Sequence, residues 1–159
     1  MKIGILGAGS WGSALANLLA YNGHEVTIWS IDQKEIEMLR EFHEQKDRLP
    51  GVILNTSIAY TTDLETVVTD KEMIVCAVPS PFVRGTAAKI ARYIKEGQLI
   101  VNVSKGIEEA TLKALVEVIE EEIPAANVAV LSGPSHAEEV GRFIPTTVVA
   151  GARNIETAQ

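Results

Sequence analysis

The sequence of 159 residues has the ordinary size of one domain and needs neither a disulfide nor a metal to bury a core. Hydrophobic residues make up 47% and charged residues 22%, which excludes long disordered stretches. Lys and Arg number 14 against 21 Asp and Glu, a net charge of -7. This balance argues against a general binder of nucleic acids or anionic membranes, since both need a basic surface, but it leaves room for a small anionic ligand at a local positive site.

Two features bear on the cellular setting. The one cysteine, Cys76, lies in the apolar run 73–78, which predicts a small buried residue and fits a reducing cytoplasm. Residues 3–24 contain no Asp, Glu, Lys or Arg, as in a signal peptide or a membrane span. Four glycines interrupt the start of that stretch, and glycine weakens a helix interior by about 1 kcal/mol relative to alanine, so we expect neither.

Strand-like apolar runs alternate with helical patterns along the chain. Residues 2–6 predict a strand, and residues 10–21 carry apolar side chains at helical spacing. After a strand at 25–29, Asp32 is typical of a helix N-cap, with Glu35 completing a capping box for a helix ending near 42. Further strands are predicted at 58–60, 73–78, 99–103, 128–131 and 146–150, and further helices at 63–68, 82–94, 112–123 and 137–140. The glutamates between 108 and 122 are interpreted as a solvated helix face.

A glycine-rich turn joins the first strand to the first helix. Residues 7–12 read GAGSWG, in which Gly7 permits a tight turn, Gly9 lets a pyrophosphate approach the backbone and Gly12 lets the helix pack closely on the sheet. The free N–H groups of the helix would face the phosphates. Trp11 is interpreted either as a core residue or as a neighbour of the phosphate site. The pattern predicts an α/β fold over residues 1–159, a Rossmann-like, doubly wound, mainly parallel sheet with helices on both faces that binds a dinucleotide.

The end of the second strand bears on the choice between NAD and NADP. An acid normally stands there and binds the adenosine ribose, but this chain has Ser30 and places its acid at Asp32. No arginine stands at the positions that would hold a 2′-phosphate, and Asp32 would repel one, although Lys34 would oppose that effect. The sequence therefore favours NAD over NADP.

Several longer motifs occur in order after the glycine turn. They read NGHEV at 22–26, AVPS at 77–80, SKGIE at 104–108, LSGPSHAEEV at 131–140 and PT at 145–146. Together they closely resemble bacterial NAD(P)-dependent glycerol-3-phosphate dehydrogenase over essentially the whole chain. The resemblance implies reversible hydride transfer between sn-glycerol 3-phosphate and dihydroxyacetone phosphate, which in bacteria supplies the glycerol backbone of phospholipids.

The resemblance also implies roles for individual residues. To the cofactor-binding Gly7, Gly9 and Gly12 of the glycine pattern it adds Ser10, Trp11, Lys105 and Ala137 at the cofactor. It places Lys105, Gly133 and Ser135 at the substrate. The chain departs from the family where Ile31 and Asp32 replace a basic pair, which weakens the case for tight NADP binding. Arg48 replaces an aromatic residue, and it is interpreted either as a contact to the adenine end or the phosphate, or as a solvated side chain.

From its position alone, Lys105 is interpreted as a solvated surface lysine, and the SKGIE match is what favours a role in the site. Lys105 follows the predicted strand 99–103 and so lies at the carboxyl edge of the sheet, where ligands bind in open α/β folds. A cation there would hold substrate oxygens or stabilise alkoxide character. Ser135 would either cap the next helix or bond a substrate oxygen, and His136 is the histidine placed near this edge. No histidine and cysteine cluster has metal-ligand spacing, so no metal is expected.

In the family a second, helical domain follows, and it supplies the lysine thought to act as general acid or base. Residues 154–159 look like the start of another helix, so we expect the amino-terminal half of an enzyme that binds cofactor without turnover. The apolar face left by the missing half would favour self-association into a homo-oligomer. Two alternatives are a related 3-hydroxyacid or 2-ketoacid dehydrogenase, and a non-catalytic NAD-sensing module complete at this length.

Overall fold

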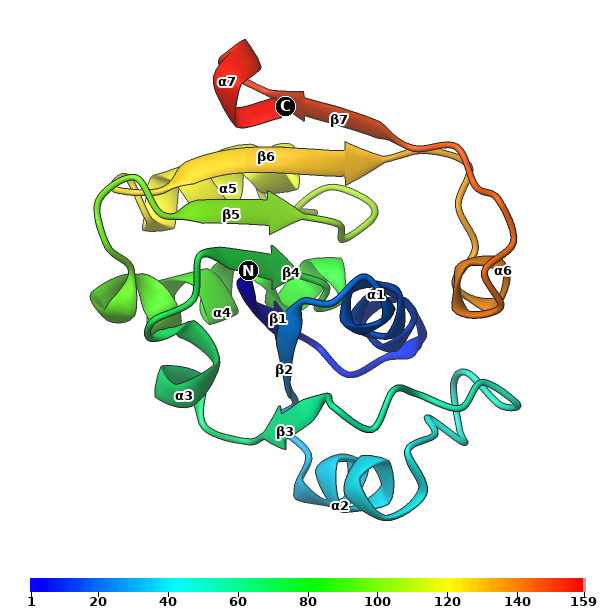
Figure 1. Ribbon diagram of the computed structural model, residues 1–159. Coiled ribbons are helices and arrows are strands. Elements are labelled where there is room, and N and C mark those ends of the chain that lie inside the picture. The colour runs from blue at the N-terminus through cyan, green and yellow to red at the C-terminus, as the bar shows by residue number, and fades with distance from the viewer. Residues whose placement is uncertain (159) are drawn as a thin grey trace.

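The computed structural model describes residues 1–158, which form one seven-stranded sheet with helices on both faces (Figure 1). The strand order is β3-β2-β1-β4-β5-β6-β7, and every neighbouring pair is parallel except β6 and β7. The strands are β1 (Lys2–Leu6), β2 (Glu25–Trp29), β3 (Ala59–Thr61), β4 (Met73–Cys76), β5 (Leu99–Asn102), β6 (Asn127–Ser132) and β7 (Val149–Ala152). The predicted doubly wound, mainly parallel sheet is confirmed.

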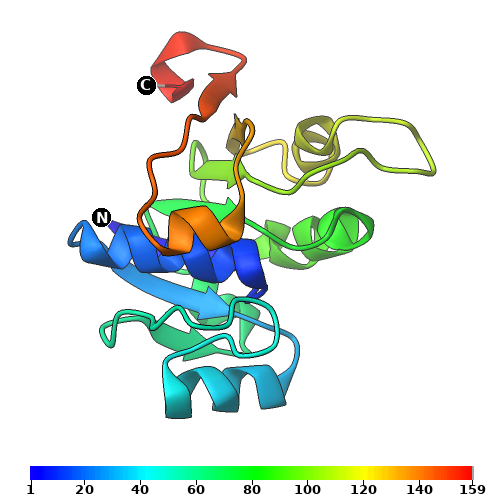
Figure 2. The ribbon, with the colours of Figure 1, turned by 90° about the vertical axis from the view of Figure 1, so that its right-hand side faces the viewer.

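The described helices other than α7 (Ile155–Ala158) divide into two layers. They are α1 (Ser10–Tyr21), α2 (Gln33–Phe42), α3 (Leu64–Val68), α4 (Val83–Ile90), α5 (Leu115–Glu122) and α6 (Ala137–Gly141). The first core cluster joins α1, α2 and α6 to one sheet face, and the second joins α3, α4 and α5 to the other. In Figures 1 and 2, α6 lies beside α1.

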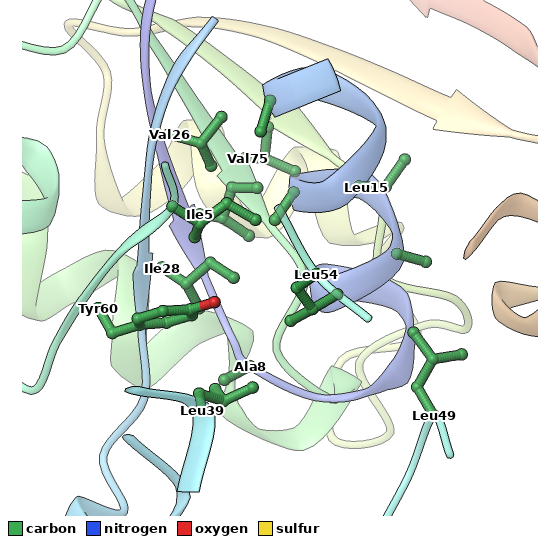
Figure 3. Packing of buried hydrophobic residues seen from close by; sticks show 14 of the residues in the cluster. Ile5, Ala8, Leu15, Val26, Ile28, Leu39, Leu49, Leu54, Tyr60 and Val75 are labelled. Atoms are coloured by element: carbon green, nitrogen blue, oxygen red, sulfur yellow. The ribbon is translucent and has the colours of Figure 1, made fainter. Parts of the chain in front are cut away.

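The two core clusters lie on opposite faces of the central strand β1, with Ile3 and Ile5 in the first cluster and Leu6 in the second. Figure 3 shows Ile5 of β1 among side chains from β2, β4 and α1, with Leu54 of the connection after α2 closing over them. Ile5 and Ile28 have no exposed surface, and Leu54 is almost fully buried. Strands covered by helices on both faces lose the alternation of polar and apolar residues that a half-exposed strand shows.

Three predicted elements needed correction. The helix predicted at 112–123 begins only at Leu115, because Leu112 has a left-handed backbone (φ 59°) and a side chain that is 74% exposed. The helix predicted at 82–94 is divided into α4 and two 3-10 turns, Ser80–Phe82 and Ala91–Tyr93. The last strand covers Val149–Ala152 rather than 146–150. The helix expected over 154–159 is present as α7, and Gln159 lies outside the described residues.

Membrane insertion by a helix was the other interpretation of residues 3–24. Across residues 1–158, no helix combines the length and the apolar character needed to cross a bilayer.

Candidate functional site

A groove of about 980 Å³ runs along the carboxyl edge of the sheet. It lies where β1 stands between β2 and β4, the point at which successive connections leave toward opposite sides of the sheet. The glycine turn, the ends of β2, β4 and β5 and the start of α6 line it. Its volume is at the upper end of the range of roughly 300–1,000 Å³ found for small-molecule sites.

The glycine turn forms the floor of this groove, and its packing explains two of the glycines. Gly7 has φ +113°, and a Cβ there would lie 2.8 Å from the carbonyl oxygen of Ala77. A Cβ on Gly12 would lie 2.0 Å from the carbonyl oxygen of Gly7, so Gly12 sets how closely α1 approaches the end of β1. Gly12 is buried, and its role here is packing rather than lining.

Gly9 faces the groove itself. A Cβ at this position would meet only the Nη1 atom of Arg48, at 3.5 Å. Gly9 is the N-cap of α1, and no side chain of residues 1–158 caps that helix end. The N–H groups of the first turn therefore face a space that an anion can enter, next to the positive end of the helix dipole.

Trp11 was interpreted either as a core residue or as a neighbour of the phosphate site, and its surroundings combine features of both. Its partly buried ring packs against the first core cluster and lines the groove together with an adjoining pocket of about 300 Å³. The indole Nε1 is buried and has no hydrogen-bond partner among the described residues. Trp11 is thus both a core residue and a wall of the groove, next to Ser10, which also lines it.

Lys105 brings together the loops that follow β5 and β6. Its Nζ donates to the carbonyl oxygens of Ser135 at 3.1 Å and Gly133 at 3.4 Å. An ammonium group has three donors, so one remains for a ligand oxygen. Ser135, His136 and Ala137 line the groove beside it, whereas Gly133 supplies only its carbonyl. The N-cap of α6 is His136. Among residues 1–158, the hydroxyl of Ser135 makes no hydrogen bond to the first turn of that helix.

The loop that carries Lys105 is fixed at both ends. Ser104 Oγ donates to the carbonyl oxygens of Val78 at 2.6 Å and Cys76 at 3.1 Å, which joins the ends of β4 and β5. The carboxylate of Glu108 receives two hydrogen bonds from Arg84 on α4, at 2.7 and 2.8 Å. The position of Lys105 therefore depends on α4 as well as on its own strand.

The glutamates between 108 and 122, which the sequence analysis interpreted as a solvated helix face, are less solvated than expected. Arg84 also donates to Glu122 at 2.6 Å and to Glu121 at 2.9 Å, so one guanidinium contacts three carboxylates. Hydrogen bonds from Arg84, and then from Thr111, lower the pKa of Glu108 to about 2. Part of the predicted solvated face is thus a charge network that connects α4, α5 and the Lys105 loop.

The first turn of α2 contains a groove-lining carboxylate, Glu35, for which the sequence predicted another role. Asp32 caps α2 as predicted, accepting from the backbone N–H of Lys34 at 2.9 Å. The predicted capping box is wrong, because the Glu35 carboxylate turns away from the cap. It accepts from Ser30 Oγ at 2.5 Å and from Gln45 Nε2 at 2.7 Å, and it lines the groove.

Sequence reasoning also missed the part of the groove lined by the segment after β4. The 3-10 turn Ser80–Phe82 and Lys89 of α4 line the groove there, and Phe82 is 62% exposed. The AVPS motif at 77–80 marked this segment, but the motif by itself assigned it no role.

Comparisons with known proteins agree with this geometry. The family described as NAD-dependent glycerol-3-phosphate dehydrogenase N-terminus matches residues 2–158. Glycerol-3-phosphate dehydrogenase (NAD(P)+) of Agathobacter rectalis is 60% identical over 99% of this chain and 47% of its own length. The enzyme of the same name from Fusobacterium nucleatum is 50% identical over 98% of this chain and 47% of its own length.

A solved structure gives the same result at the level of the fold. The crystal structure of glycerol-3-phosphate dehydrogenase from Coxiella burnetii superposes with a TM-score of 0.90 at 30% identity, covering 99% of this chain and 50% of that one. The chain spans about half the length of the curated relatives it matches. It belongs to the family of the NAD-dependent glycerol-3-phosphate dehydrogenase N-terminus.

Proposed function

We propose that this chain is the dinucleotide-binding part of an NAD(P)-dependent glycerol-3-phosphate dehydrogenase. The observation that carries the proposal is the groove floor at Gly9, where an uncapped helix N-terminus faces open space at the carboxyl edge of a parallel sheet. The family assignment favours a glycerol phosphate substrate over a 3-hydroxy acid or a 2-ketoacid, and an enzyme over a sensing module.

The residues present fit a nicotinamide dinucleotide. The backbone N–H groups at Ser10 and Trp11 would hold the pyrophosphate, with Gly9 leaving room for it. Ala137 and the ring of Trp11 would border the cofactor toward the β5 and β6 end of the groove. The bound cofactor supplies or accepts a hydride. The chain's own contribution is to hold the cofactor in the groove and to keep water from its covered side.

Lys105 has the position of a substrate-holding residue. Its ammonium is tied to the carbonyl oxygens of Gly133 and Ser135, which fixes its place at the groove while leaving a donor for a substrate oxygen. A fixed cation there would stabilise the negative charge that develops on the carbonyl oxygen during reduction. The hydroxyl of the buried Ser135 would supply a second hydrogen bond to the substrate.

The same proposal assigns the proton-transfer lysine, and most of the residues that bind the substrate phosphate, to a second, helical domain. In support, the curated relatives are about twice as long as this chain. We further propose that the reaction takes place in the cytoplasm and supplies glycerol 3-phosphate for phospholipids. The buried thiol of Cys76 is consistent with a reducing compartment.

The test is a titration of this chain with NADH and NADPH, followed by tryptophan fluorescence and by calorimetry. We expect saturable binding of at least one dinucleotide and no measurable reduction of dihydroxyacetone phosphate. Gly9→Ala should melt within a few degrees of wild type, because its Cβ makes only an ordinary contact, yet bind the dinucleotide more weakly. A folded chain that binds neither dinucleotide would refute the proposal, and turnover by the chain alone would refute the role given to a second domain.

A further inference from the structure

The groove contains one carboxylate that is held from behind by buried polar groups. Glu35 lies in the first turn of α2, and its side chain is only 12% exposed. Ser30 Oγ donates to one carboxylate oxygen at 2.5 Å, and Gln45 Nε2 donates to the other at 2.7 Å. Both donors are on buried residues, at 5% and 1% exposure. Two such donors fix the orientation of the carboxylate.

Gln45 connects this carboxylate to the glycine turn. The same Nε2 that donates to Glu35 also donates to the carbonyl oxygen of Ala8 at 2.7 Å. Ala8 stands between the first two glycines of the turn, so Glu35 is held in register with the floor of the groove. The carboxylate therefore belongs to the β2 end of the same groove rather than to the outer surface of α2.

Asp32, the other acid at this end, has a different function in the fold. Its exposed side chain accepts the backbone N–H of Lys34 and caps α2. Its own N–H donates to Ser30 Oγ at 3.1 Å. Asp32 thus stabilises the start of the helix, while Ser30 directs its hydroxyl hydrogen to Glu35.

A cation stands beside Glu35 on the open side of the groove. The Nη1 atom of Arg48 lies 3.8 Å from Glu35 Oε1, and its side chain is 61% exposed. The same atom would lie 3.5 Å from a Cβ on Gly9, which places the guanidinium above the phosphate turn. An exposed pair at this distance is weak, so the guanidinium is free to turn toward another anion.

We propose that Glu35 selects the dinucleotide at its adenosine ribose, accepting a hydrogen bond from the 2′-hydroxyl of NADH and repelling the 2′-phosphate of NADPH. This assignment rests on the proposed function of the groove. Ser30 and Gln45 are positioning residues that keep the carboxylate aimed at the groove. Arg48 is the cation that would turn to a 2′-phosphate once the carboxylate is neutral.

The size of the effect follows from simple electrostatics. Two unit charges about 4 Å apart in water change an equilibrium constant by about fivefold. A 2′-phosphate carries more than one charge near pH 7, so neutralising Glu35 should change the selectivity by about tenfold. Selectivity is defined here as the Kd for NADPH divided by the Kd for NADH.

The experiment compares wild type, Glu35→Gln, Asp32→Asn and Glu37→Gln by calorimetric titration with NADH and with NADPH. Glu37→Gln is the matched control, because it removes the same charge from an exposed position of α2 outside the groove. We expect Glu35→Gln to weaken NADH binding and strengthen NADPH binding, lowering the selectivity about tenfold. The control should leave the selectivity within about twofold of wild type, because a distant charge in water is screened.

Each other outcome has a definite meaning. Unchanged selectivity in Glu35→Gln, with NADH still bound, would overturn the role assigned to Glu35 and leave the proposed function of the groove standing. A change of selectivity in Asp32→Asn without one in Glu35→Gln would show that Asp32 discriminates between the dinucleotides, and would also overturn the role assigned to Glu35. A folded wild-type chain that binds neither dinucleotide would overturn the proposed function of the groove, and this assignment with it.

Discussion

A methyl group at position 12 tests how closely α1 must approach the end of β1. In the structure, an alanine Cβ at Gly12 would lie 2.0 Å from the carbonyl oxygen of Gly7 and 3.1 Å from its carbonyl carbon. Contacts below 3.0 Å are essentially never made by real Cβ atoms, so the helix must move by about 1 Å. Both clashing atoms are backbone, and no side-chain rotation can relieve the contact.

The expected cost follows from two opposing effects. Overpacking of this kind costs about 1–3 kcal/mol, and a backbone clash favours the upper end of that range. Alanine returns up to about 1 kcal/mol through its higher helix propensity. The net loss for Gly12→Ala is then about 2 kcal/mol, which corresponds to a fall in Tm of roughly 4–8 °C for a chain of this size.

Gly85→Ala is the matched control for this substitution. Gly85 lies inside α4, and a Cβ there would meet no atom from outside its own helix within 4 Å. Alanine there should raise the stability by about 0.5–1 kcal/mol. Thermal and urea unfolding followed by circular dichroism measures both variants. A Tm for Gly12→Ala within about 1 °C of wild type would refute the steric argument, as would an equal loss in Gly85→Ala.

Three further predictions concern groups away from the glycine turn. Arg84→Gln should lower the free energy of unfolding at pH 7. The pairing with Arg84 depresses the pKa of Glu108 to about 2 in the folded protein, whereas the unfolded value is near 4.3. The pair therefore stabilises the fold above the unfolded pKa, and this stabilisation is lost as the pH falls toward 2. Urea titrations should therefore show the gap to wild type closing between about pH 5 and 2, and a constant gap would contradict this. Burial raises the pKa of Cys76 to about 11, so iodoacetamide at pH 8 should modify it, by mass spectrometry, only after unfolding. Asn17→Ala should cost about 1–3 kcal/mol in urea unfolding, because Asn17 Oδ1 accepts the N–H of Asn55 at 2.8 Å in a buried position; an unchanged midpoint would show that water replaces this bond.

The parts of the fold that sequence predicts have local causes. The strands of the parallel sheet are continuous apolar runs, and helices on both faces require that pattern. Gly7 and Gly12 are explained by contacts within the turn and with the neighbouring strand, which the GxGxxG spacing encodes. Asp32 caps α2 through an N–H only two residues away.

What the sequence could not predict depends on contacts between distant segments. Leu112 fits the apolar stripe of α5, yet the Lys105 loop takes a left-handed turn there and leaves it exposed. Glu35 has the spacing of a capping box, but the buried amide of Gln45 competes for its carboxylate. No local pattern marks Gln45 as buried, since its place is set by the carbonyl of Ala8, which lies 37 residues earlier in the chain.

The order of strands has a consequence for how this chain is made. β1 is central in the sheet, with Ile3 paired to Val26 on one side and to Met73 on the other. At about 5–20 residues per second, a ribosome needs roughly 4–14 s between making β1 and making its second neighbour. During that interval one edge of an apolar strand stays unpaired, and such edges invite contact with other chains. Residues as late as Glu138 line the binding groove, so the groove cannot be complete on a nascent chain until the start of α6 has been made.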